Sequence, residues 1–406
     1  MPENYFNIMK TYQRPVLKQI AERMKSKRLF IQVLFGARQV GKTTLVLQLL
    51  EQINVPSQFH LADNVPAVDK NWLKQIWDEA RIQLLNSQQN EFILVIDEIQ
   101  KIENWSEAVK REWDLDTIAG RNIKVILLGS SRLMLQQGLT ESLAGRFEAT
   151  YIPHWSFAEM RNAFGWSIEQ YAWYGAYPAT AELLDNPERL FDYIRNSLIE
   201  TSISKDIIML TRIDKPALLR RLFEIACVHS AKMLSLTKIQ GNLQEKGNLL
   251  TLANYLHLLS EAALLAGLEK FSGNIIRKRA SLPKFQVFNN ALISSMLNIT
   301  FENAQNNPKL WGQIMESAVG AYLINNAVSN KYNLYYWNEN NNEVDFVLEK
   351  NGTVIALEVK SGKDSSNAGL TIFNEKFKPK HVFTIGTNGI SFEDFFNLNP
   401  IQLFDI

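Results

Sequence analysis

The hydrophobic positions follow three successive patterns along the chain, and the first predicts a parallel sheet. Over the first third, apolar runs of strand length alternate with longer amphipathic stretches, and the runs cover residues 29–35, 92–96 and 125–128. Strands that helices cover on both faces of a sheet are apolar almost throughout, as these runs are. We expect helices between them, over residues 45–51 and 67–85.

The second pattern predicts a helical region and the third predicts a return to strands. From about residue 157 to residue 270, apolar residues recur three and four positions apart, as on one face of a helix. In the last third, strand-like runs surround one helix expected near residues 311–328. We therefore predict an α/β protein of three domains, covering residues 1–155, 156–275 and 276–406.

Composition excludes several classes of protein. No apolar run approaches the roughly twenty residues that a membrane-spanning helix needs. The single cysteine, Cys227, excludes a disulfide framework and a cysteine-built zinc site. The first residues include Glu3 and contain no apolar signal core. We expect a cytoplasmic protein with no membrane partner.

The charge is balanced overall but not locally. The chain has 43 basic and 42 acidic residues, and its net charge of +1 produces no general attraction to nucleic acid. Residues 1–30 nevertheless contain two acidic residues and seven basic ones: Lys10, Arg14, Lys18, Arg23, Lys25, Lys27 and Arg28. A solvated helix face is the simpler interpretation of this stretch. The local excess of basic residues weakens the argument against nucleic acid as a partner without reversing it.

A glycine-rich motif carries the most specific chemistry. Residues 36–43 fit the pattern G-x-x-x-x-G-K-[ST] and lie between an apolar run and a helical one. In such a loop, backbone N–H groups cradle phosphate oxygens, the lysine reaches the β and γ phosphates, and the hydroxyl binds Mg²⁺. No guanine-recognition motif N-K-x-D is present, which favours ATP. We predict a Mg-ATP site formed by Gly36, Ala37, Arg38, Gln39, Val40, Gly41, Lys42, Thr43 and Thr44.

The ends of the next two apolar runs supply candidates for hydrolysis. Asp97 ends the second run and is expected to hold the Mg²⁺ shell. Glu98 is placed to orient or deprotonate an attacking water, or else faces solvent. Ser130 follows the third run and could sense the γ phosphate. Arg132 and Arg146 are candidates for stabilising transition-state charge, although a lone arginine is more often a salt-bridge partner.

The last third contains a predicted hairpin rich in carboxylates. Two strand-like runs flank Asn351-Gly352, a strong signal for a two-residue turn. That turn places Asp345 opposite Glu358, and Glu343 opposite Lys360, all four on one face because side chains alternate along a strand.

Opposed carboxylates repel each other unless a cation lies between them, which suggests a metal site. Mg²⁺ suits it, since this ion is held by one or two carboxylates, water and substrate phosphate, and Mn²⁺ is the alternative ion. Lys360 could then position or activate a water that attacks a phosphodiester. A fold that keeps these charges as a Lys–Glu network is the competing interpretation.

The chain resembles bacterial and archaeal ATPases of the AAA type whose carboxyl part belongs to the PD-(D/E)xK nuclease-like superfamily. The resemblance covers nearly the whole length and rests on the motifs GARQVGKTTL, VIDEIQ, LLGSSRLML with ESLAGRFE, YGAYPAT, and EVDFVLEKNGTVIALEVKSGK. It implies a P-loop ATPase sheet, a helical and winged-helix region, and an α/β nuclease-like domain.

The resemblance also assigns residues. Pro178, with Gly175, would contact the nucleotide base, or would simply form a turn. Asp345, Glu358 and Lys360 match the nuclease core, and Glu316 matches the acidic metal ligand of the preceding helix. The family pattern has proline where Val344 stands.

DNA reading by the middle region is poorly supported. Residues 233–268 look like a winged helix, but residues 250–266 contain no Lys or Arg. Packing against the ATPase domain is the expected role of the second helix of this segment, at residues 249–256.

Three functions remain open. The first is an ATPase whose turnover rearranges the later domains. The second is a metal-dependent DNA nuclease, and the third is a nucleotide-dependent switch that docks DNA or protein without cleavage. ATP is the expected ligand, and DNA, a protein partner or self-association are the candidate partners.

Overall fold

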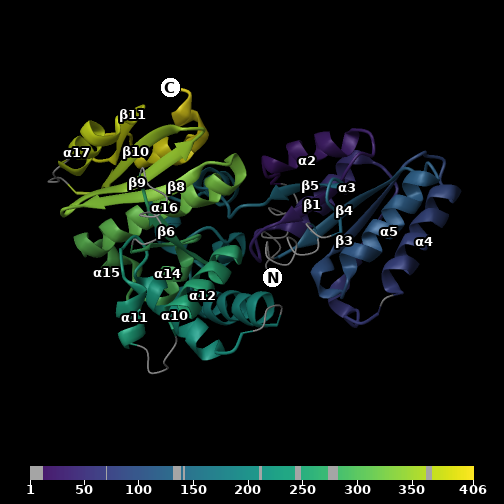
Figure 1. Cartoon of the computed structure of the whole chain (residues 1–406), viewed down its shortest axis with the longest axis horizontal. Helices are drawn as coiled ribbons and strands as arrows, with labels where there is room; N and C mark the ends of the chain where they lie inside the picture. Colours follow the sequence, from purple (N-terminus) through teal and green to yellow (C-terminus); the bar gives the residue numbers. More distant parts are fainter. Residues whose placement is uncertain are drawn as a thin grey trace. The chain divides into compact units, whose positions relative to one another are not determined.

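The chain forms two compact units, Met1–Ile152 (unit 1) and Pro153–Ile406 (unit 2) (Figure 1). The computed structural model describes residues 12–69, 71–130, 139, 142–209, 213–242, 248–272, 282–362 and 368–406. Unit 2 contains both the predicted middle domain and the predicted last domain. The division into three domains stays a prediction.

Unit 1 is built on a five-stranded parallel sheet, which confirms the α/β prediction for this part of the chain. The strand order is β2-β3-β4-β1-β5, and every neighbouring pair is parallel. The strands are β1 (Ile31–Phe35), β2 (Ser57–Leu61), β3 (Phe92–Asp97), β4 (Ile123–Gly129) and β5 (Phe147–Tyr151). The predicted apolar runs coincide with the three central strands, because nearly all their residues are buried. The apolar pattern does not predict the half-buried edge strands β2 and β5.

Helices cover both faces of this sheet. They are α2 (Val16–Lys25), α3 (Lys42–Ile53), α4 (Trp72–Asn86) and α5 (Trp105–Ile118). Helix α2 contacts α3 and helix α4 contacts α5, and Figure 1 shows one pair on each side of the strands. The core between the sheet and the second pair includes Trp77, Trp105 and Trp113. Helices α3 and α4 confirm the two helices predicted between the apolar runs.

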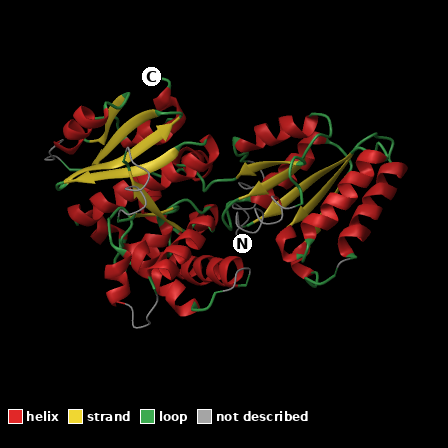
Figure 2. Cartoon of the chain, viewed as in Figure 1, coloured by secondary structure: helices red, strands yellow, loops and turns green. Residues whose placement is uncertain are grey.

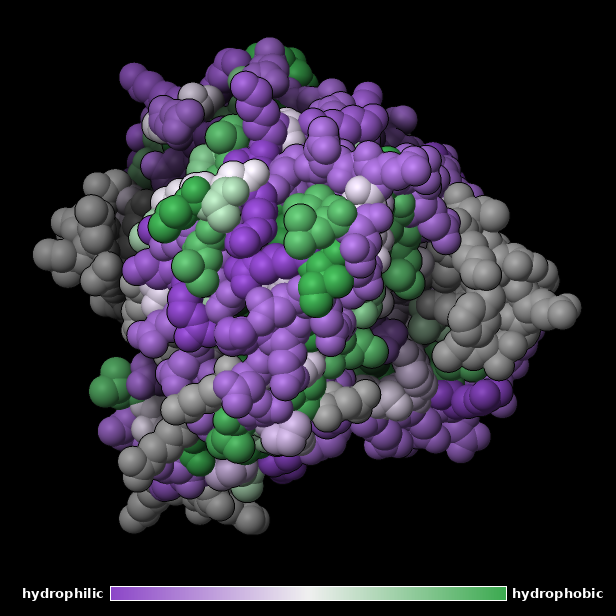
Figure 3. All heavy atoms as spheres, turned by 90° about the vertical axis from the view of Figure 1, so that its right-hand side faces the viewer, coloured by the Kyte–Doolittle hydropathy of each residue, from purple (hydrophilic) through white to green (hydrophobic). Residues whose placement is uncertain are grey.

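The outer side of α4 and α5 is mainly hydrophilic, with scattered hydrophobic groups (Figure 3). Exposed apolar side chains on these helices include Ile82, Leu85 and Ile118. Such side chains are common on soluble domains and do not by themselves define an interface.

Unit 2 begins with a helical region, as predicted. The α-helices of unit 2 up to residue 305 are α7 (Phe157–Phe164), α8 (Ile168–Tyr174), α9 (Pro187–Asp192), α10 (Pro216–Val228), α11 (Leu236–Asn242), α12 (Leu249–Glu261), α14 (Ala291–Met296) and α15 (Phe301–Gln305). A 3₁₀ segment, η3 (Pro178–Leu183), and two π-helical segments, η4 (Tyr193–Ile199) and η5 (Ser202–Ile208), connect them. Helix α10 buries its predicted apolar stripe and packs on α12.

A six-stranded mixed sheet completes unit 2, in the order β11-β10-β9-β8-β6-β7 (Figure 2). Its strands are β6 (Leu265–Lys270), β7 (Lys284–Val287), β8 (Asn333–Glu339), β9 (Asn342–Lys350), β10 (Thr353–Lys360) and β11 (His381–Gly386). The helices of this part are α16 (Pro308–Asn330), α17 (Ala368–Phe377) and α18 (Phe392–Asn397), followed by the 3₁₀ segment η6 (Pro400–Phe404). Among the described residues, no helix combines the length and the apolar character needed to cross a bilayer.

The turn between β9 and β10 confirms the predicted hairpin. Asn351 and Gly352 have φ angles of 50° and 81°, so both central residues adopt the left-handed conformation that a type I′ turn requires. Lys350 pairs with Thr353, and the register continues to the pair Phe346 and Leu357.

Candidate functional site

The phosphate loop lies between the end of β1 and the first turn of α3. A β carbon on Gly36 would lie 2.1 Å from the carbonyl oxygen of Ile152, so a larger residue does not fit there. Gly41 has a φ of 87°, a left-handed conformation that glycine adopts without strain. The loop therefore leads directly into the amino terminus of α3, whose first N–H groups can hold phosphate oxygens.

Lys42 begins α3 and directs its ammonium back to the loop. Its Nζ donates hydrogen bonds to the carbonyl oxygens of Gly36, at 3.0 Å, and Ala37, at 2.8 Å. Both acceptors are uncharged, so these two bonds do not neutralise the positive charge of the buried side chain. A lysine at this place in such a loop reaches the β and γ phosphates of a bound nucleotide.

Thr43 and Asp97 form the second part of the nucleotide site. The Thr43 hydroxyl donates a hydrogen bond of 2.8 Å to Oδ2 of Asp97. Oδ1 of the same carboxylate accepts a hydrogen bond from the backbone N–H of Glu98 at 2.9 Å. A hydroxyl beside a buried carboxylate supplies the oxygen ligands that Mg²⁺ takes together with water and phosphate. The residues therefore fit the ion that a P-loop nucleotide brings with it.

Glu98 follows β3 in a strained conformation and is held by two polar side chains. Its φ of 55° is left-handed, which is uncommon outside glycine and recurs at functional sites. Oε2 of Glu98 accepts hydrogen bonds from Gln100, at 2.6 Å, and from the Ser130 hydroxyl, at 3.3 Å. The sequence predicts Glu98 and Ser130 as site residues but does not predict Gln100. The position of Gln100 in the motif VIDEIQ, two residues after Glu98, is the signal that could have identified it.

Arg14 is a second residue of this region that sequence analysis misses. It is only 4% exposed, and its Nη1 donates a hydrogen bond of 3.0 Å to the carbonyl oxygen of Val40 inside the loop. Gln48 of α3 donates to the carbonyl oxygen of Tyr12 at 3.0 Å. The segment before α2 is thereby attached to the phosphate loop and to the helix that follows it.

The solvated-face interpretation of the basic amino-terminal stretch is wrong for Arg14, and also for Arg23 and Arg28. Arg23 donates a hydrogen bond of 2.7 Å to Thr150. Arg28 lies 3.4 Å from the centre of the Trp113 ring and donates to the carbonyl oxygen of Ile123 at 2.8 Å. These contacts attach the stretch to the five-stranded sheet and to α5.

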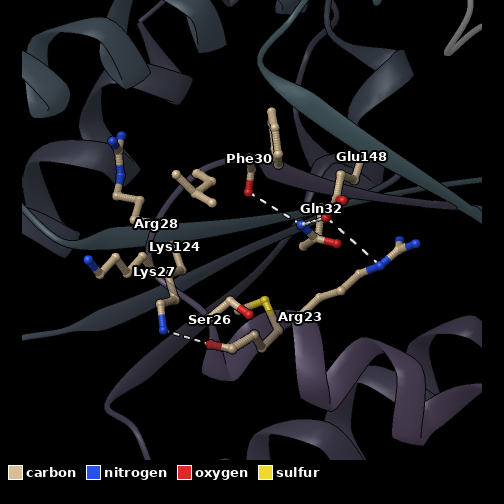
Figure 4. A pocket seen from close by; sticks show the side chains of 10 residues that line it. Arg23, Ser26, Lys27, Arg28, Phe30, Gln32, Lys124 and Glu148 are labelled. Carbon is tan, nitrogen blue, oxygen red and sulfur yellow. Dashed lines mark hydrogen bonds and ion pairs between the residues drawn. The ribbon is translucent and has the colours of Figure 1, made fainter.

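A pocket beside this stretch is lined by Arg23, Lys27, Arg28 and Lys124, together with Glu148 (Figure 4). Lys124 donates to the carbonyl oxygen of Met24 at 2.6 Å and forms an ion pair with Glu91 at 2.7 Å. Three of the four basic side chains are thus occupied by partners within unit 1. Their arrangement is that of a structural network that attaches this stretch to the rest of unit 1.

The two arginine candidates have different outcomes. Arg132 lies outside the described residues. Arg146 forms a two-bond ion pair with Asp114, at 2.8 and 3.1 Å, and this hydrogen bonding raises its pKa above the usual value. The structure therefore places Arg146 in the salt-bridge role that competes with a role in hydrolysis.

Pro178 lies in unit 2, at the start of η3. The preceding Gly175 has a φ of 74°, and a β carbon there would lie 2.0 Å from Oδ1 of Asn289. The same oxygen accepts a hydrogen bond from the N–H of Ala176 at 2.9 Å. Close packing on Asn289 accounts for the glycine, and the contact of Pro178 with a nucleotide base stays a prediction.

The carboxylate hairpin brings Asp345 and Glu358 to neighbouring strands, both largely buried. Oδ2 of Asp345 accepts a hydrogen bond of 2.8 Å from the backbone N–H of Val359. Oε1 of Glu358 lies 2.6 Å from Nζ of Lys360. Burial, with repulsion from Asp345, raises the pKa of Glu358 to about 7.

A lysine that sequence analysis misses lies among the other carboxylates. Lys284 has no solvent exposure, and its Nζ lies 2.6 Å from Glu316, 3.1 Å from Glu343 and 3.5 Å from Asp345. Lys284 is the first residue of β7, whose short sequence KFQV carries no clear signal that its lysine is buried. We call Lys284 and these three carboxylates the buried charge cluster. The predicted register places Glu343 opposite Lys360, and the structure adds an ion pair of Glu343 with Lys284.

The charges of the buried charge cluster shift one another. Burial opposes the charge of Lys284, but attraction to the three carboxylates outweighs it, so the pKa of Lys284 lies above its usual value. Burial, aided by Asp345, raises the pKa of Glu316 to about 8. The predicted metal ligands Glu316 and Asp345 thus share one lysine, while Glu358 pairs with another.

Comparison with known families matches three parts of the chain. The model of an AAA domain matches residues 29–161. Two domains of unknown function follow, DUF8612 over residues 165–303 and DUF4143 over residues 311–404. The first part of the chain is therefore an AAA P-loop domain, as the resemblance implied, and the functions of the two domains after it are unknown.

Relatives of the chain occur in archaea and bacteria. It is 25% identical to the uncharacterized protein MJ1544 of Methanocaldococcus jannaschii over 78% of this chain and 72% of that protein. It is 24% identical to an uncharacterized protein of Haemophilus influenzae over 58% of this chain and 61% of that protein. Among solved structures, the Aeropyrum pernix ORC1 protein in complex with DNA gives a TM-score of 0.30 at 12% identity, covering 69% of this chain and 90% of that one. A score of this size carries no argument about function.

Proposed function

We propose that unit 1 binds Mg-ATP and hydrolyses it. The hydrogen bond between Thr43 and Asp97, beside a loop closed by Lys42, is the observation that carries the proposal. It brings the two expected magnesium ligands from the end of one strand and the start of one helix into contact. The match to an AAA domain over residues 29–161 supports the same conclusion.

Each polar group of the site then has a task. The loop N–H groups and Lys42 bind the β and γ phosphates, while Thr43 and Asp97 hold the magnesium shell. Glu98 orients the attacking water and accepts its proton. For this step Glu98 exchanges its hydrogen bonds to Gln100 and Ser130 for bonds to water, so these two residues position the base. Bound Mg²⁺ supplies charge neutralisation at the phosphates.

The proposed role of unit 2 is to respond to ATP turnover in unit 1. In this proposal unit 2 is a nuclease-like or DNA-binding domain. The order of α16, the β8-β9-β10 meander, α17 and β11 supports the nuclease-like fold, because the matching motif residues fall on this helix and on these strands. Metal-dependent cleavage would use Asp345, Glu358 and Lys360, with Glu316 from the helix.

Phosphate release from Mg-ATP tests the ATPase proposal. Wild-type protein is compared with Lys42→Ala and with Thr43→Ala, each with and without added DNA. We expect release from the wild type, lost in both variants and when Mg²⁺ is chelated. Lys74→Ala, an exposed lysine of α4, is the matched control and should hydrolyse like the wild type. Equal phosphate release by the wild type and Lys42→Ala under every condition would contradict the proposal.

A further inference from the structure

We propose that the Lys284 ammonium is the resident cation of the buried charge cluster, so that the cluster binds no divalent metal while Lys284 is present. The nuclease-like resemblance implies a metal held by Glu316 and Asp345 of this cluster together with Glu358. The inference rests on the nuclease-like fold proposed for unit 2 but is independent of ATP hydrolysis in unit 1. It favours a unit 2 that binds its partner without metal-dependent cleavage.

The spacing of the carboxylates would suit an ion if the lysine were absent. Glu316, Glu343 and Asp345 each offer an oxygen, and these oxygens lie within 4.8 Å of one another. The Lys284 Nζ already lies within 3.5 Å of an oxygen of each one. Mg²⁺ needs oxygen ligands at about 2.0–2.1 Å, so an ion on these oxygens would lie beside the ammonium and be repelled by it.

Lys284 is held in place by its backbone as well as by its side chain. On β7 it pairs with Leu268 of β6, and on the other side it bridges to Met233. Its Nζ also donates to the carbonyl oxygen of Asp345 at 3.3 Å and lies 5.1 Å from the centre of the Phe346 ring. A charge that leaves such a site without a new partner is strongly disfavoured, so the ammonium does not withdraw to admit a metal.

The neighbouring carboxylates do not supply a second complete site. Both oxygens of Asp345 already have partners, one at Lys284 and one at the N–H of Val359. Glu358 pairs through Oε1 with Lys360, and its Oε2 is buried without a hydrogen-bond partner in the part of the chain that the structure describes. One carboxylate oxygen, on a group whose other oxygen already pairs with an ammonium, is a poor ligand set for a divalent ion.

Mn²⁺ binding measured by electron paramagnetic resonance tests the inference, since bound ion removes the signal of free Mn²⁺. All proteins carry Thr43→Ala and are kept free of nucleotide, which removes the metal site of the phosphate loop. We compare this parent with Asp345→Asn, with Lys284→Met and with Lys284→Met/Asp345→Asn. We expect no binding by the parent, about one ion per chain with Lys284→Met, and a loss of that binding in the double variant.

Two controls make each outcome decisive. Lys360→Met removes the other lysine of this region and should not create a site, and circular dichroism shows whether each variant is folded. Mn²⁺ bound by the parent and lost on Asp345→Asn would overturn the inference, whether or not Lys284→Met folds. A folded Lys284→Met that binds no Mn²⁺ would also overturn it. Neither result bears on phosphate release by unit 1.

Discussion

Two buried lysines, Lys42 in unit 1 and Lys284 in unit 2, meet opposite kinds of partner. Two backbone carbonyl oxygens, of Gly36 and Ala37, accept hydrogen bonds from Lys42. Lys284 is surrounded by three carboxylates. Carbonyl groups hold an ammonium without neutralising it, whereas carboxylates do neutralise it. A buried lysine can thus hold an anionic ligand or act as a structural counter-ion, depending on which groups accept its hydrogen bonds.

The largest expected effect is on the stability of unit 2. Lys284→Met should lower the free energy of unfolding by about 3–5 kcal/mol, because it leaves the buried Asp345 and the partly buried Glu316 and Glu343 without their cation. Thermal unfolding followed by circular dichroism, without added metal, measures the change. Lys309→Met, an exposed lysine at the start of α16, should change stability by less than about 0.5 kcal/mol. Equal effects of the two substitutions would remove the contrast between Lys284 and an ordinary lysine.

The next effect separates nucleotide binding from hydrolysis in unit 1. Glu98→Gln should lower phosphate release by roughly 10²–10⁴-fold, because the amide cannot accept the proton of water. Binding of ATP should be kept, since Glu98 is not expected to hold the phosphates. Fluorescent-nucleotide binding measures this, and Lys42→Ala should lose binding and hydrolysis together. If Glu98→Gln hydrolyses ATP at the wild-type rate, then Glu98 is not the base.

The third expected effect is a dependence of the stability of unit 2 on pH. Burial raises the pKa of Glu358 to about 7, from 4.5 in the unfolded chain. Between these values the folded chain keeps a proton that the unfolded chain has lost, so stability falls as pH rises. For one proton the slope is at most about 1.4 kcal/mol per pH unit.

Unfolding midpoints at pH 5, 6 and 7 would test this slope. Glu316, whose pKa is raised by burial from 4.5 to about 8, adds a second proton over the same range and continues the slope above pH 7. Glu358→Gln should therefore roughly halve the slope between pH 5 and pH 7, because the amide stays neutral throughout. Glu375→Gln changes an exposed carboxylate of α17 and should leave the slope unchanged. A slope that is as steep in Glu358→Gln as in the wild type would contradict the assignment.

The smallest effect concerns the partly exposed pair Arg146 and Asp114. Arg146→Ala and Asp114→Ala should each cost less than about 1 kcal/mol of stability, as is usual for ion pairs near the surface. If Arg146 acts only in this pair, the two variants should also release phosphate at similar rates. A much slower rate in Arg146→Ala alone would show that the arginine stabilises the transition state.

The local features of both units could be predicted from the sequence because they depend on neighbouring residues. Apolar runs predicted the central strands β1, β3 and β4, where burial on both faces leaves a continuous signal. The turn at Asn351 and Gly352 set the register of β9 and β10. The edge strands β2 and β5 were missed because half-buried strands carry no such signal.

The residues that sequence analysis missed act over longer separations, except for Gln100. Arg14 contacts a carbonyl oxygen 26 residues away, and Lys284 contacts Asp345, 61 residues away. Neither contact follows from spacing or periodicity, because each depends on how two elements pack. Gln100 is near Glu98 in sequence, but its contact depends on the left-handed conformation of Glu98.

The sequence by itself determined the chemistry of the phosphate loop and the placing of carboxylates on one hairpin. Both follow from rules that act over a few residues, namely glycine conformations, turn geometry and the alternation of side chains. The tertiary structure alone decided which cation those carboxylates meet. A strand 59 residues away from Glu343 inserts Lys284 among them, and the energy of a buried charge depends on all the charges that packing brings near it.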